Sequence, residues 1–430
     1  MSGLSRRRFL GASAAAVVAA GAMARGTVFG ANDRIGVCVA GVNGRGTAHI
    51  GGFSDSDRSE VVALCDPDEQ VLEQRAKELE KRTGKAPKKY VDIRDALADE
   101  SIHVLGIATP NHWHSLATVW ACQAGKDVYV EKPLSHEVWE GRQVVAAAKQ
   151  YGRIVQHGTQ RRSESNWVRD MALLQSGEII GPLYMARALC YKRRDGLTAA
   201  GDQEPPAHLH WRIWQGPATE KPYNPLYVHY NWHWFWHYGN GDIGNQGVHQ
   251  MDVAAWGMNK GLPVKVQSAG GRYTYKDPCE TPNTQVATFT YSDGTMTVFE
   301  VRGRWTNSEE GVGVGNLFYA DRGYFVEGKG FFSEKGEAIP VDPAKYPEPE
   351  SAGPFENFLR AVRDRNDQLV HGTALEGHIA SAHCHLANVA YRLGRAIDFD
   401  PATETCPHDE EANAMLRREY HPDFAVPPLA

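Results

Sequence analysis

The stretch that decides the fold is IGVCVAGVNGRG, residues 35–46. Its first half is a short, continuously apolar run, which is typical of a strand buried in a parallel sheet. Its second half holds Gly41, Gly44 and Gly46, and a helical pattern begins at the last of these. A strand that passes through a glycine-rich turn into a helix is the first part of a dinucleotide-binding βαβ unit.

The next apolar run supplies the second part of this pattern, because it ends in Asp66, twenty residues after Gly46. Glycines permit close approach of a pyrophosphate, the helix N-terminus faces the anion, and the acid accepts hydrogen bonds from ribose hydroxyls. Asn43 occupies the usual place of the second glycine. The Asp66 carboxylate repels the 2'-phosphate of NADP, so the sequence favours NAD. Binding of NADP stays possible, because the cationic Arg45 and several lysines lie near these residues in the sequence. The cofactor-binding residues predicted here are Gly41, Asn43, Gly44, Arg45, Gly46 and Asp66. The alternative is a purely structural turn.

Outward from this stretch, short apolar runs alternate with helical patterns, which predicts parallel strands covered by helices. Expected strands are residues 35–40, 60–65, 103–108, 127–130 and 153–156, and expected helices are 46–53, 69–83, 92–98, 114–124 and 136–151. After residue 159 the segments become longer and alternate in hydrophobicity, at 183–189, 264–269, 285–291, 295–301 and 317–326, with late helices at 355–365 and 375–393.

We therefore expect an α/β protein of two domains. Residues 31–157 would form a Rossmann domain with a doubly wound parallel sheet. Residues 158–430 would form a C-terminal α/β domain with a large open, mostly antiparallel sheet. The late helices would pack on that sheet or return to the first domain.

Composition excludes several other classes of protein. The 430 residues are 42% hydrophobic and 23% charged, which is enough to bury a core, and the formal net charge is −6. This mild acidity, without a basic stripe, argues against a nucleic-acid partner. The seven cysteines are scattered and odd in number, so they predict neither a disulfide framework nor a CxxC metal site. We expect no metal.

Residues 1–30 read as a segment apart from the domains. Arg6-Arg7-Arg8-Phe9-Leu10 precedes a weakly apolar, alanine-rich run, and Ala22-Met23-Ala24 fits a cleavage site. The segment resembles a twin-arginine signal, which implies export of the folded protein to the periplasm or another extracytoplasmic space. The alternative is a basic terminus before a short helix. We find no other segment apolar enough to span a membrane, so no integral membrane segment is expected after removal of the signal.

Two further motifs directly follow predicted strands, where ligands gather in doubly wound folds. The first contains Thr109, Pro110, Asn111 and His114, and the second is Glu131-Lys132-Pro133. Proline disfavours the helical conformation of the residue before it, so Lys132 is presented on an extended backbone. With these motifs the chain resembles the glucose-fructose oxidoreductase, inositol dehydrogenase and rhizopine catabolism family, Gfo/Idh/MocA, and the Glu-Lys-Pro triplet is its most specific mark.

The resemblance implies a nicotinamide cofactor between the two domains and a homodimer or homotetramer assembled through the open sheet. In that family the lysine of Glu-Lys-Pro lies beside the nicotinamide and the substrate hydroxyl, a role that falls on Lys132. Glu131 would orient the backbone or the cofactor, or would simply be a paired surface acid. The alternative for Lys132 is a solvated surface lysine.

The family's second catalytic element is an acid followed four places later by histidine, near the start of a helix. His249 matches the histidine, but Asn245 stands at the position of the acid. Asparagine orients a group and cannot take a proton, so the role of base falls on His249, whose usual pKa of about 6.5 suits it. Asp242 is a possible displaced carboxylate. The alternative for His249 is a structural histidine at a helix start.

Substrate-binding residues are predicted from three places. In residues 229–238 aromatic side chains recur at period two, which in a strand would present Trp232 and Trp234 on one face as a sugar platform, with His233 opposite. A metal site or a packing strand at a subunit contact are the alternatives. Gln160 would border the nicotinamide, and Arg161 would meet substrate or form a salt bridge at the domain hinge. Asp252, one turn beyond His249, is a further candidate.

The predicted reaction is hydride transfer between C4 of the nicotinamide and a carbinol carbon of a sugar, glycoside or cyclitol. His249 would remove the hydroxyl proton, Lys132 would stabilise the developing alkoxide, and Asn245 would set the geometry. Two alternatives stay open. One is an NAD-dependent glycoside hydrolase or lyase that oxidises its substrate transiently and recycles the cofactor. The other is a non-catalytic nucleotide- or sugar-binding protein.

Overall fold

Six parallel strands form the first sheet of the computed structural model, which describes residues 33–430. The expected export signal lies outside the described residues. The strand order is β3-β2-β1-β4-β5-β6, the doubly wound order that was predicted. The strands are β1 (Ile35–Ala40), β2 (Ser59–Cys65), β3 (Lys88–Tyr90), β4 (Val104–Ile107), β5 (Asp127–Val130) and β6 (Val155–His157).

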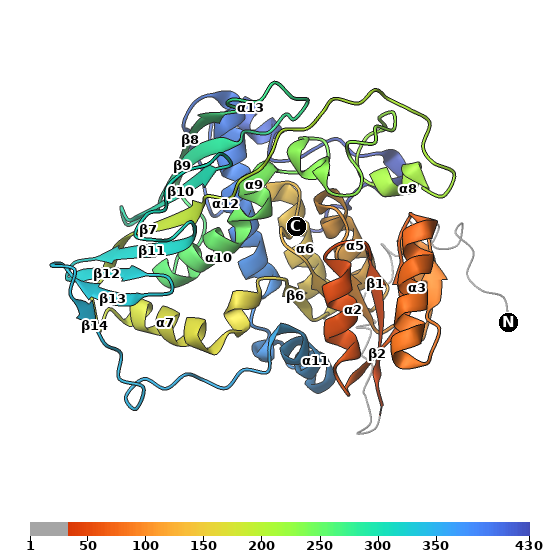
Figure 1. The fold of residues 1–430 in the computed structure, drawn as a ribbon, viewed down its shortest axis with the longest axis horizontal. Helices are drawn as coiled ribbons and strands as arrows, with labels where there is room; N and C mark the ends of the chain where they lie inside the picture. Colours follow the sequence, from red (N-terminus) through yellow and green to blue (C-terminus); the bar gives the residue numbers. More distant parts are fainter. Residues whose placement is uncertain (1–32) are drawn as a thin grey trace.

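Helices cover both faces of this sheet (Figure 1). They are α2 (Gly46–Ser54), α3 (Glu69–Thr83), α4 (Ile93–Leu97), α5 (Asn111–Gln123) and α6 (Val138–Tyr151). Every residue of β1 is buried, which explains why its sequence is apolar without alternation. The strand order reverses between β1 and β4, so the loops after these two strands open a crevice at the carboxyl ends, where ligands bind in such folds.

Nine strands form the second sheet, in the order β14-β13-β12-β11-β7-β10-β9-β8-β15. β7 and β10 run parallel, and the other neighbouring strands run antiparallel. The strands are β7 (Leu183–Cys190), β8 (Lys265–Gly271), β9 (Thr284–Thr290), β10 (Met296–Arg302), β11 (Val314–Ala320), β12 (Gly323–Val326), β13 (Gly330–Ser333), β14 (Ala338–Ile339) and β15 (Ile397–Asp398). The predicted fold class, a parallel Rossmann sheet with a mostly antiparallel second sheet, is confirmed.

One face of the second sheet packs against α7 (Ser165–Ser176), α10 (Gly247–Met258) and α12 (Ala374–Leu393). Burial alternates along β10, so the sheet has one covered and one more open face. α12 begins with a capping box between Thr373 and Glu376 and runs between the two sheets, where it contacts α6 and β8 (Figure 1). α11 (Pro354–Asp364) returns to the first sheet, where Phe355 stacks on Tyr129 with ring centroids 4.9 Å apart.

Two predicted elements differ in the structure, and one helix was not predicted. Residues 229–238 are not a strand: Asn231–Trp234 form a 3-10 turn, because local backbone hydrogen bonds such as Phe235 N to Trp232 O (3.2 Å) close tight turns. The single segment expected at 317–326 is a hairpin of β11 and β12. α7 was missed, although Trp167, Met171 and Leu174 follow a helical spacing and Gly177 ends the helix.

The remaining short helices are α8 (Trp211–Gln215), α9 (Gly241–Asn245) and α13 (Glu410–Ala414), with 3-10 turns at Gln160–Ser163, Asp367–Leu369 and Pro422–Phe424. All seven cysteines are buried free thiols. Within residues 33–430 no helix is long and apolar enough to cross a membrane, and no group of side chains could hold a metal ion.

Candidate active site

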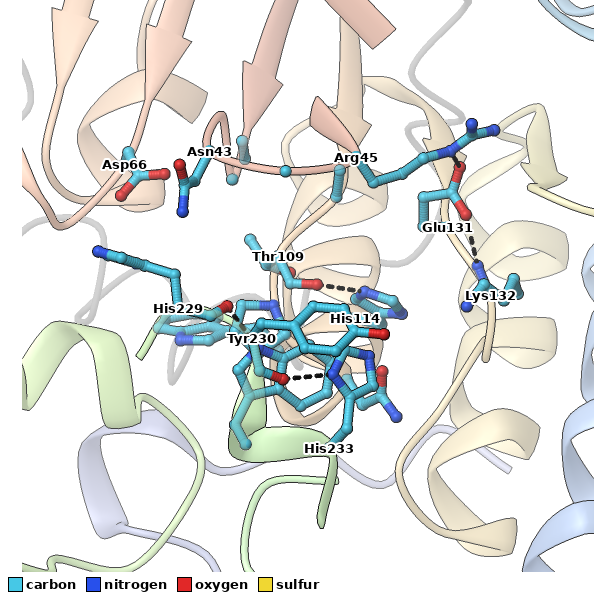
Figure 2. Close-up of a pocket in the computed structure, with 18 of the residues that line it drawn as sticks. Asn43, Arg45, Asp66, Thr109, His114, Glu131, Lys132, His229, Tyr230 and His233 are labelled. Carbon is cyan, nitrogen blue, oxygen red and sulfur yellow. Dashed lines mark hydrogen bonds and ion pairs between the residues drawn. The ribbon is translucent and has the colours of Figure 1, made fainter. Parts of the chain in front are cut away.

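A cavity of about 500 Å³ lies at the switch point of the first sheet, between the loops after β1, β2, β4 and β5 and the part of the chain that follows β7. Figure 2 shows Asn43 and Asp66 at one end of this pocket, Lys132 at the other, and His229, Tyr230 and His233 facing them. Its lining includes, of the predicted residues, Gly41, Asn43, Gly44, Arg45, Asp66, Thr109, Pro110, Asn111, His114, Glu131, Lys132, Gln160, Trp232, His233, Asn245 and His249.

The glycine-rich loop is shaped to admit a diphosphate. Gly41 has φ +81°, and a Cβ there would lie 2.6 Å from the carbonyl carbon of Ala108. A Cβ at Gly46 would lie 1.9 Å from the Gly41 oxygen, so this residue closes the turn without lining the pocket. A Cβ at Gly44 would meet nothing within 4 Å, which leaves open space beside the backbone. The loop therefore fits the dinucleotide that the sequence predicts.

Asp66 joins this loop to the neighbouring strand. Its carboxylate accepts hydrogen bonds from the backbone N–H groups of Val42 (2.8 Å) and Asp68 (3.0 Å). Burial raises the pKa of Asp66 to about 6, although these two hydrogen bonds oppose the shift. The side chain is only 6% exposed and lines the pocket, in the position from which an acid accepts ribose hydroxyls.

Glu131, directly after β5, is the centre of a buried charge cluster. It accepts a hydrogen bond from Arg45 Nε at 2.6 Å (Figure 2) and another from His49 Nε2 at 3.1 Å. Burial opposes ionisation, but the hydrogen bond from His49 and the charges of Arg45 and Lys132 lower the pKa of Glu131. Glu131 is thus an ionised anchor that fixes Arg45 of the glycine-rich loop against the Glu-Lys-Pro segment, and the alternative of a surface acid is wrong.

Lys132 reaches across the pocket to the second domain. The Lys132–Pro133 peptide bond is cis. Lys132 Nζ donates to the backbone oxygen and to Oδ1 of Asn245, each at 3.0 Å. Burial lowers the pKa of Lys132, and the nearby charge of Glu131 partly offsets this effect. Lys132 is therefore a half-buried, oriented donor and not a solvated surface lysine.

His249, near the start of α10, lines the same pocket as Lys132 and Asn245. Burial, followed by the positive charge of Lys132, lowers the pKa of His249 to about 3. The imidazole is therefore neutral near pH 7, which is the state that accepts a proton, but its pKa lies well below the ordinary value expected from the sequence. Three predicted catalytic side chains from distant parts of the chain thus converge in one pocket.

The loop after β4 is tied to the Glu-Lys-Pro segment through His114. Its ring nitrogens lie 2.5 Å from the Pro133 oxygen and 2.8 Å from the Thr109 oxygen. Asn111 Nδ2 donates to Asn240 Oδ1 at 2.9 Å and so connects the two domains. Within residues 33–430, Thr109 Oγ1 and Gln160 Oε1 are buried without a hydrogen-bond partner. Both residues line the pocket, and these atoms are available to a ligand there.

Two predicted substrate residues lie elsewhere. Arg161 forms an ion pair with Glu327 and stacks over Trp167, 4.7 Å from the ring centroid, so the salt-bridge alternative describes it. Asp252 is 1% exposed, and both of its oxygens accept from Arg162 Nε, at 2.8 and 3.0 Å. These ion pairs hold Arg161 and Asp252 outside the pocket lining.

Two other candidates are also placed outside it. Trp234 packs under Arg194, whose guanidinium carbon lies 5.2 Å from the ring centroid. The same arginine holds Asp242 in a bidentate ion pair at 2.8 and 3.0 Å. Asp242 is therefore committed to Arg194 and does not provide a displaced catalytic carboxylate.

One wall of the pocket was not anticipated, and we call it the strap, residues 206–235. It adds Ile213, Trp214, His229 and Tyr230 to the lining, together with the predicted Trp232 and His233. Trp232 and His233 stack with centroids 3.6 Å apart. The density of aromatic residues was the available signal, but the period-two interpretation covered only residues 229–238 and assigned them the wrong conformation.

The strap is fastened to the Rossmann domain at the N-terminus of α3. Glu69 N donates to His208 O and His210 N donates to Pro67 O, each at 2.9 Å. Two histidines contact the carboxylate of Asp68: His208 Nδ1 lies 3.0 Å from Oδ1, and His229 Nε2 lies 3.1 Å from Oδ2. Because Asp68 lies two residues after Asp66, the strap closes over the ribose end of the pocket.

Comparison with known protein families agrees with this geometry. Residues 35–159 match the model of the oxidoreductase family NAD-binding Rossmann fold, and residues 190–426 match that of the oxidoreductase family C-terminal alpha/beta domain. The chain belongs to the Gfo/Idh/MocA oxidoreductase family. The predicted NAD-binding Rossmann domain is therefore confirmed.

Curated members of this family match over part of their length. A glycosyl hydrolase family 109 protein of Shewanella pealeana is 32% identical over 135 residues, which are 30% of either chain. An inositol 2-dehydrogenase of Salmonella typhimurium is 31% identical over 147 residues, 34% of this chain and 43% of the relative. The matched region thus spans less than half of each relative.

Solved structures share the whole fold at low identity. The WlbA dehydrogenase of Chromobacterium violaceum, crystallised with NADH and UDP-GlcNAcA, superimposes with a TM-score of 0.67 at 16% identity and covers 87% of this chain and 98% of its own. An aldose-aldose oxidoreductase of Caulobacter crescentus, complexed with glycerol, gives 0.60 at 17% identity and covers 85% and 100%. These structures show a common architecture.

Proposed function

We propose that this protein is an NAD-dependent oxidoreductase acting on a CH–OH carbon of a sugar, glycoside or cyclitol. The observation that carries the proposal is that Lys132, Asn245 and His249 line one pocket with the glycine-rich loop. The loop would hold the diphosphate of NAD and Asp66 a ribose, which directs the nicotinamide toward Lys132. When bound, NAD supplies the hydride chemistry that side chains lack.

Each catalytic side chain has a defined task in this proposal. Lys132 Nζ, positioned by its two bonds to Asn245, donates to the substrate oxygen and stabilises negative charge on it. Neutral His249 accepts the hydroxyl proton. Both groups are half-buried in the pocket, and a lower local dielectric than that of water strengthens these interactions. The inositol 2-dehydrogenase relative supports a polyhydroxylated ring as the substrate class.

A second candidate is a glycoside hydrolase or lyase that oxidises its substrate transiently and returns the hydride from the same cofactor. Two observations favour it: the similarity to a glycosyl hydrolase family 109 protein, and the strap fastened over the ribose end of the pocket. An enclosed cofactor suits a reaction in which NAD is recycled and not exchanged.

The yield of reduced cofactor separates these functions. Folded protein is purified, its bound nucleotide is identified, and a panel of sugars, glycosides and cyclitols is screened with added NAD for absorbance of the reduced nicotinamide. A dehydrogenase forms one NADH per substrate consumed, whereas the recycling enzyme forms product without net NADH. Tight sugar binding without any change at the nicotinamide or in the sugar would contradict both and favour a binding protein.

We also propose that the twin-arginine segment directs export of the folded protein to an extracytoplasmic space, after cofactor loading. Arg6, Arg7 and the alanine-rich run support this proposal. We propose a homodimer or homotetramer assembled through the more open face of the nine-stranded sheet, on which Val286 is 40% exposed. Cell fractionation and light scattering test these two proposals.

A further inference from the structure

A second cavity, of about 370 Å³, lies apart from the candidate active site. It is bounded by the turn before α6, the end of the aromatic segment, the end of α12 and the chain after α13. Asn240 stands between the two cavities: it accepts from Asn111 of the active-site pocket and donates to the backbone oxygen of His136 in the second one, each at 2.9 Å.

Four cationic side chains line this second cavity, and none of them forms an ion pair with a carboxylate of residues 33–430. They are Lys221, Arg392, Arg417 and Arg418. The three arginines are nevertheless held in place. Arg392 stacks on Trp236 at 5.4 Å and Arg417 on Trp139 at 4.0 Å, while Arg418 Nη2 donates to the His237 oxygen at 3.0 Å. Oriented guanidinium groups that form no direct ion pair are suited to a carboxylate or phosphate.

Two buried atoms at this cavity lack a hydrogen-bond partner within the described chain, Arg418 Nη1 and His136 Nε2. His136 is 2% exposed, and its Nδ1 lies 2.9 Å from Glu137 Oε1. When Nδ1 donates to that carboxylate, Nε2 of the neutral ring is an acceptor. The cavity therefore offers a donor for an oxyanion and, next to it, an acceptor for a hydroxyl group.

We propose that this second cavity binds a small hydroxycarboxylic acid. Its carboxylate would lie between Arg392 and Arg418, and its hydroxyls would donate to His136 Nε2 and to Glu137. Three acids also line the cavity, Glu137, Glu280 and Glu419, and none of them pairs directly with the arginines. Glu137 contacts His136 and is acted on by the charges of Arg418 and Arg392, and Glu280 accepts from the Trp236 N–H (2.8 Å). A volume of about 370 Å³ has room for a molecule of sugar-acid size.

The experiment is calorimetric titration of NAD-saturated protein with gluconate as the probe, at constant ionic strength. Saturable binding is expected, and Arg392→Gln and Arg418→Gln should each weaken it by about tenfold or more. Arg395→Gln is the matched control, because that guanidinium pairs with Asp409 outside the cavity and the variant should bind normally. Glucitol, the uncharged analogue, should not bind to this site.

Inorganic phosphate distinguishes a bare oxyanion site from the proposed one. Phosphate binding as tight as that of gluconate, heat that does not saturate, or equal affinity in all variants would overturn the proposal. If Arg418→Gln fails to fold, Arg392→Gln decides, because this side chain stacks on a ring and donates no hydrogen bond to another residue of the described chain, 33–430. The readout does not depend on hydride chemistry, so it is separate from the proposed function.

Discussion

The ammonium of Lys132 is held by an amide, Asn245, at a position where the resemblance implies an acid. An amide orients the ammonium but does not stabilise its charge as a carboxylate does. Because Asn245 carries no charge, it does not counteract the effect of burial, which lowers the pKa of Lys132.

Replacing Asn245 by aspartate tests this effect. A carboxylate beside Nζ favours the charged form, so we expect Asn245→Asp to raise the pKa of Lys132 and to move the alkaline limb of kcat/KM upward by about one pH unit or more. Asn245→Ser is the neutral control and should leave that limb in place. An unchanged alkaline limb in the aspartate variant would show that Lys132 does not need its proton.

Residues predicted from a sequence motif line the candidate pocket more often than residues predicted from their place along a helix or strand. Glu131, Lys132 and His249 were found because their spacing to strands and loops is local in the sequence. Asp252 was misplaced because its partner Arg162 lies 90 residues away, and no local pattern reveals that ion pair. The low pKa of His249 was equally hidden, since it results from burial by the assembled fold.

At the scale of elements, the strap is held by contacts of two histidines with a single carboxylate. Asp68 accepts from Gln70 N (3.0 Å) and Val71 N (3.2 Å) as the N-cap of α3, in addition to facing His208 and His229. Asparagine keeps the capping oxygen but removes the charge. This substitution therefore separates closure of the strap from stability of the helix.

We expect Asp68→Asn to release NAD at least about fivefold faster, because each lost charge-assisted hydrogen bond costs on the order of 1 kcal/mol. Stopped-flow displacement of bound NADH, followed by fluorescence, measures the rate. Asp57→Asn is the control, since it makes the same change of charge at an exposed residue outside the strap and the pocket lining. Equal release rates for wild type and Asp68→Asn would mean that the strap does not retain the cofactor.

Regular elements of the fold were largely predictable, and irregular ones were not. β1 and α3 match the predicted bounds because continuous burial and a strong helical period leave one interpretation. The strap was misread because an aromatic residue at every second position also fits compact turns, in which each ring packs by tertiary contact. The hairpin of β11 and β12 was read as one strand because its turn at Asp321 is very short.

At the scale of the whole molecule, burial of neutral histidines links stability to pH. Burial lowers the pKa of three histidines to about 3 and of three others to about 4: His157, His233 and His249, then His237, His383 and His385. In the unfolded chain each titrates near about 6.5, so between these values the unfolded state binds more protons. The stabilisation is complete above pH 6.5 and is lost as pH falls toward 4.

Three buried carboxyls act in the opposite direction. Burial raises the pKa of Asp66 and Asp252 to about 6 and of Glu140 to about 7. As pH falls, these groups therefore bind protons in the folded state at a higher pH than in the unfolded state. Burial also raises the pKa of four further carboxyls, Asp127, Glu137, Asp170 and Glu327, and lowers that of five further histidines, His103, His112, His114, His136 and His371. The histidines still outnumber the carboxyls, and we expect the urea midpoint to fall when pH is lowered from 7.5 to 5. An equal or higher midpoint at pH 5 would contradict this balance.

The central claim is that the two domains bring Lys132 and His249 together at the nicotinamide. Its most direct test is the single-turnover rate of reduction of bound NAD by a substrate found in the screen. Lys132→Ala should lower this rate by about a hundredfold or more while changing the Kd for NAD by less than about twofold. Lys85→Ala, an exposed lysine paired with Glu60, is the control. An unchanged rate in Lys132→Ala would contradict the account.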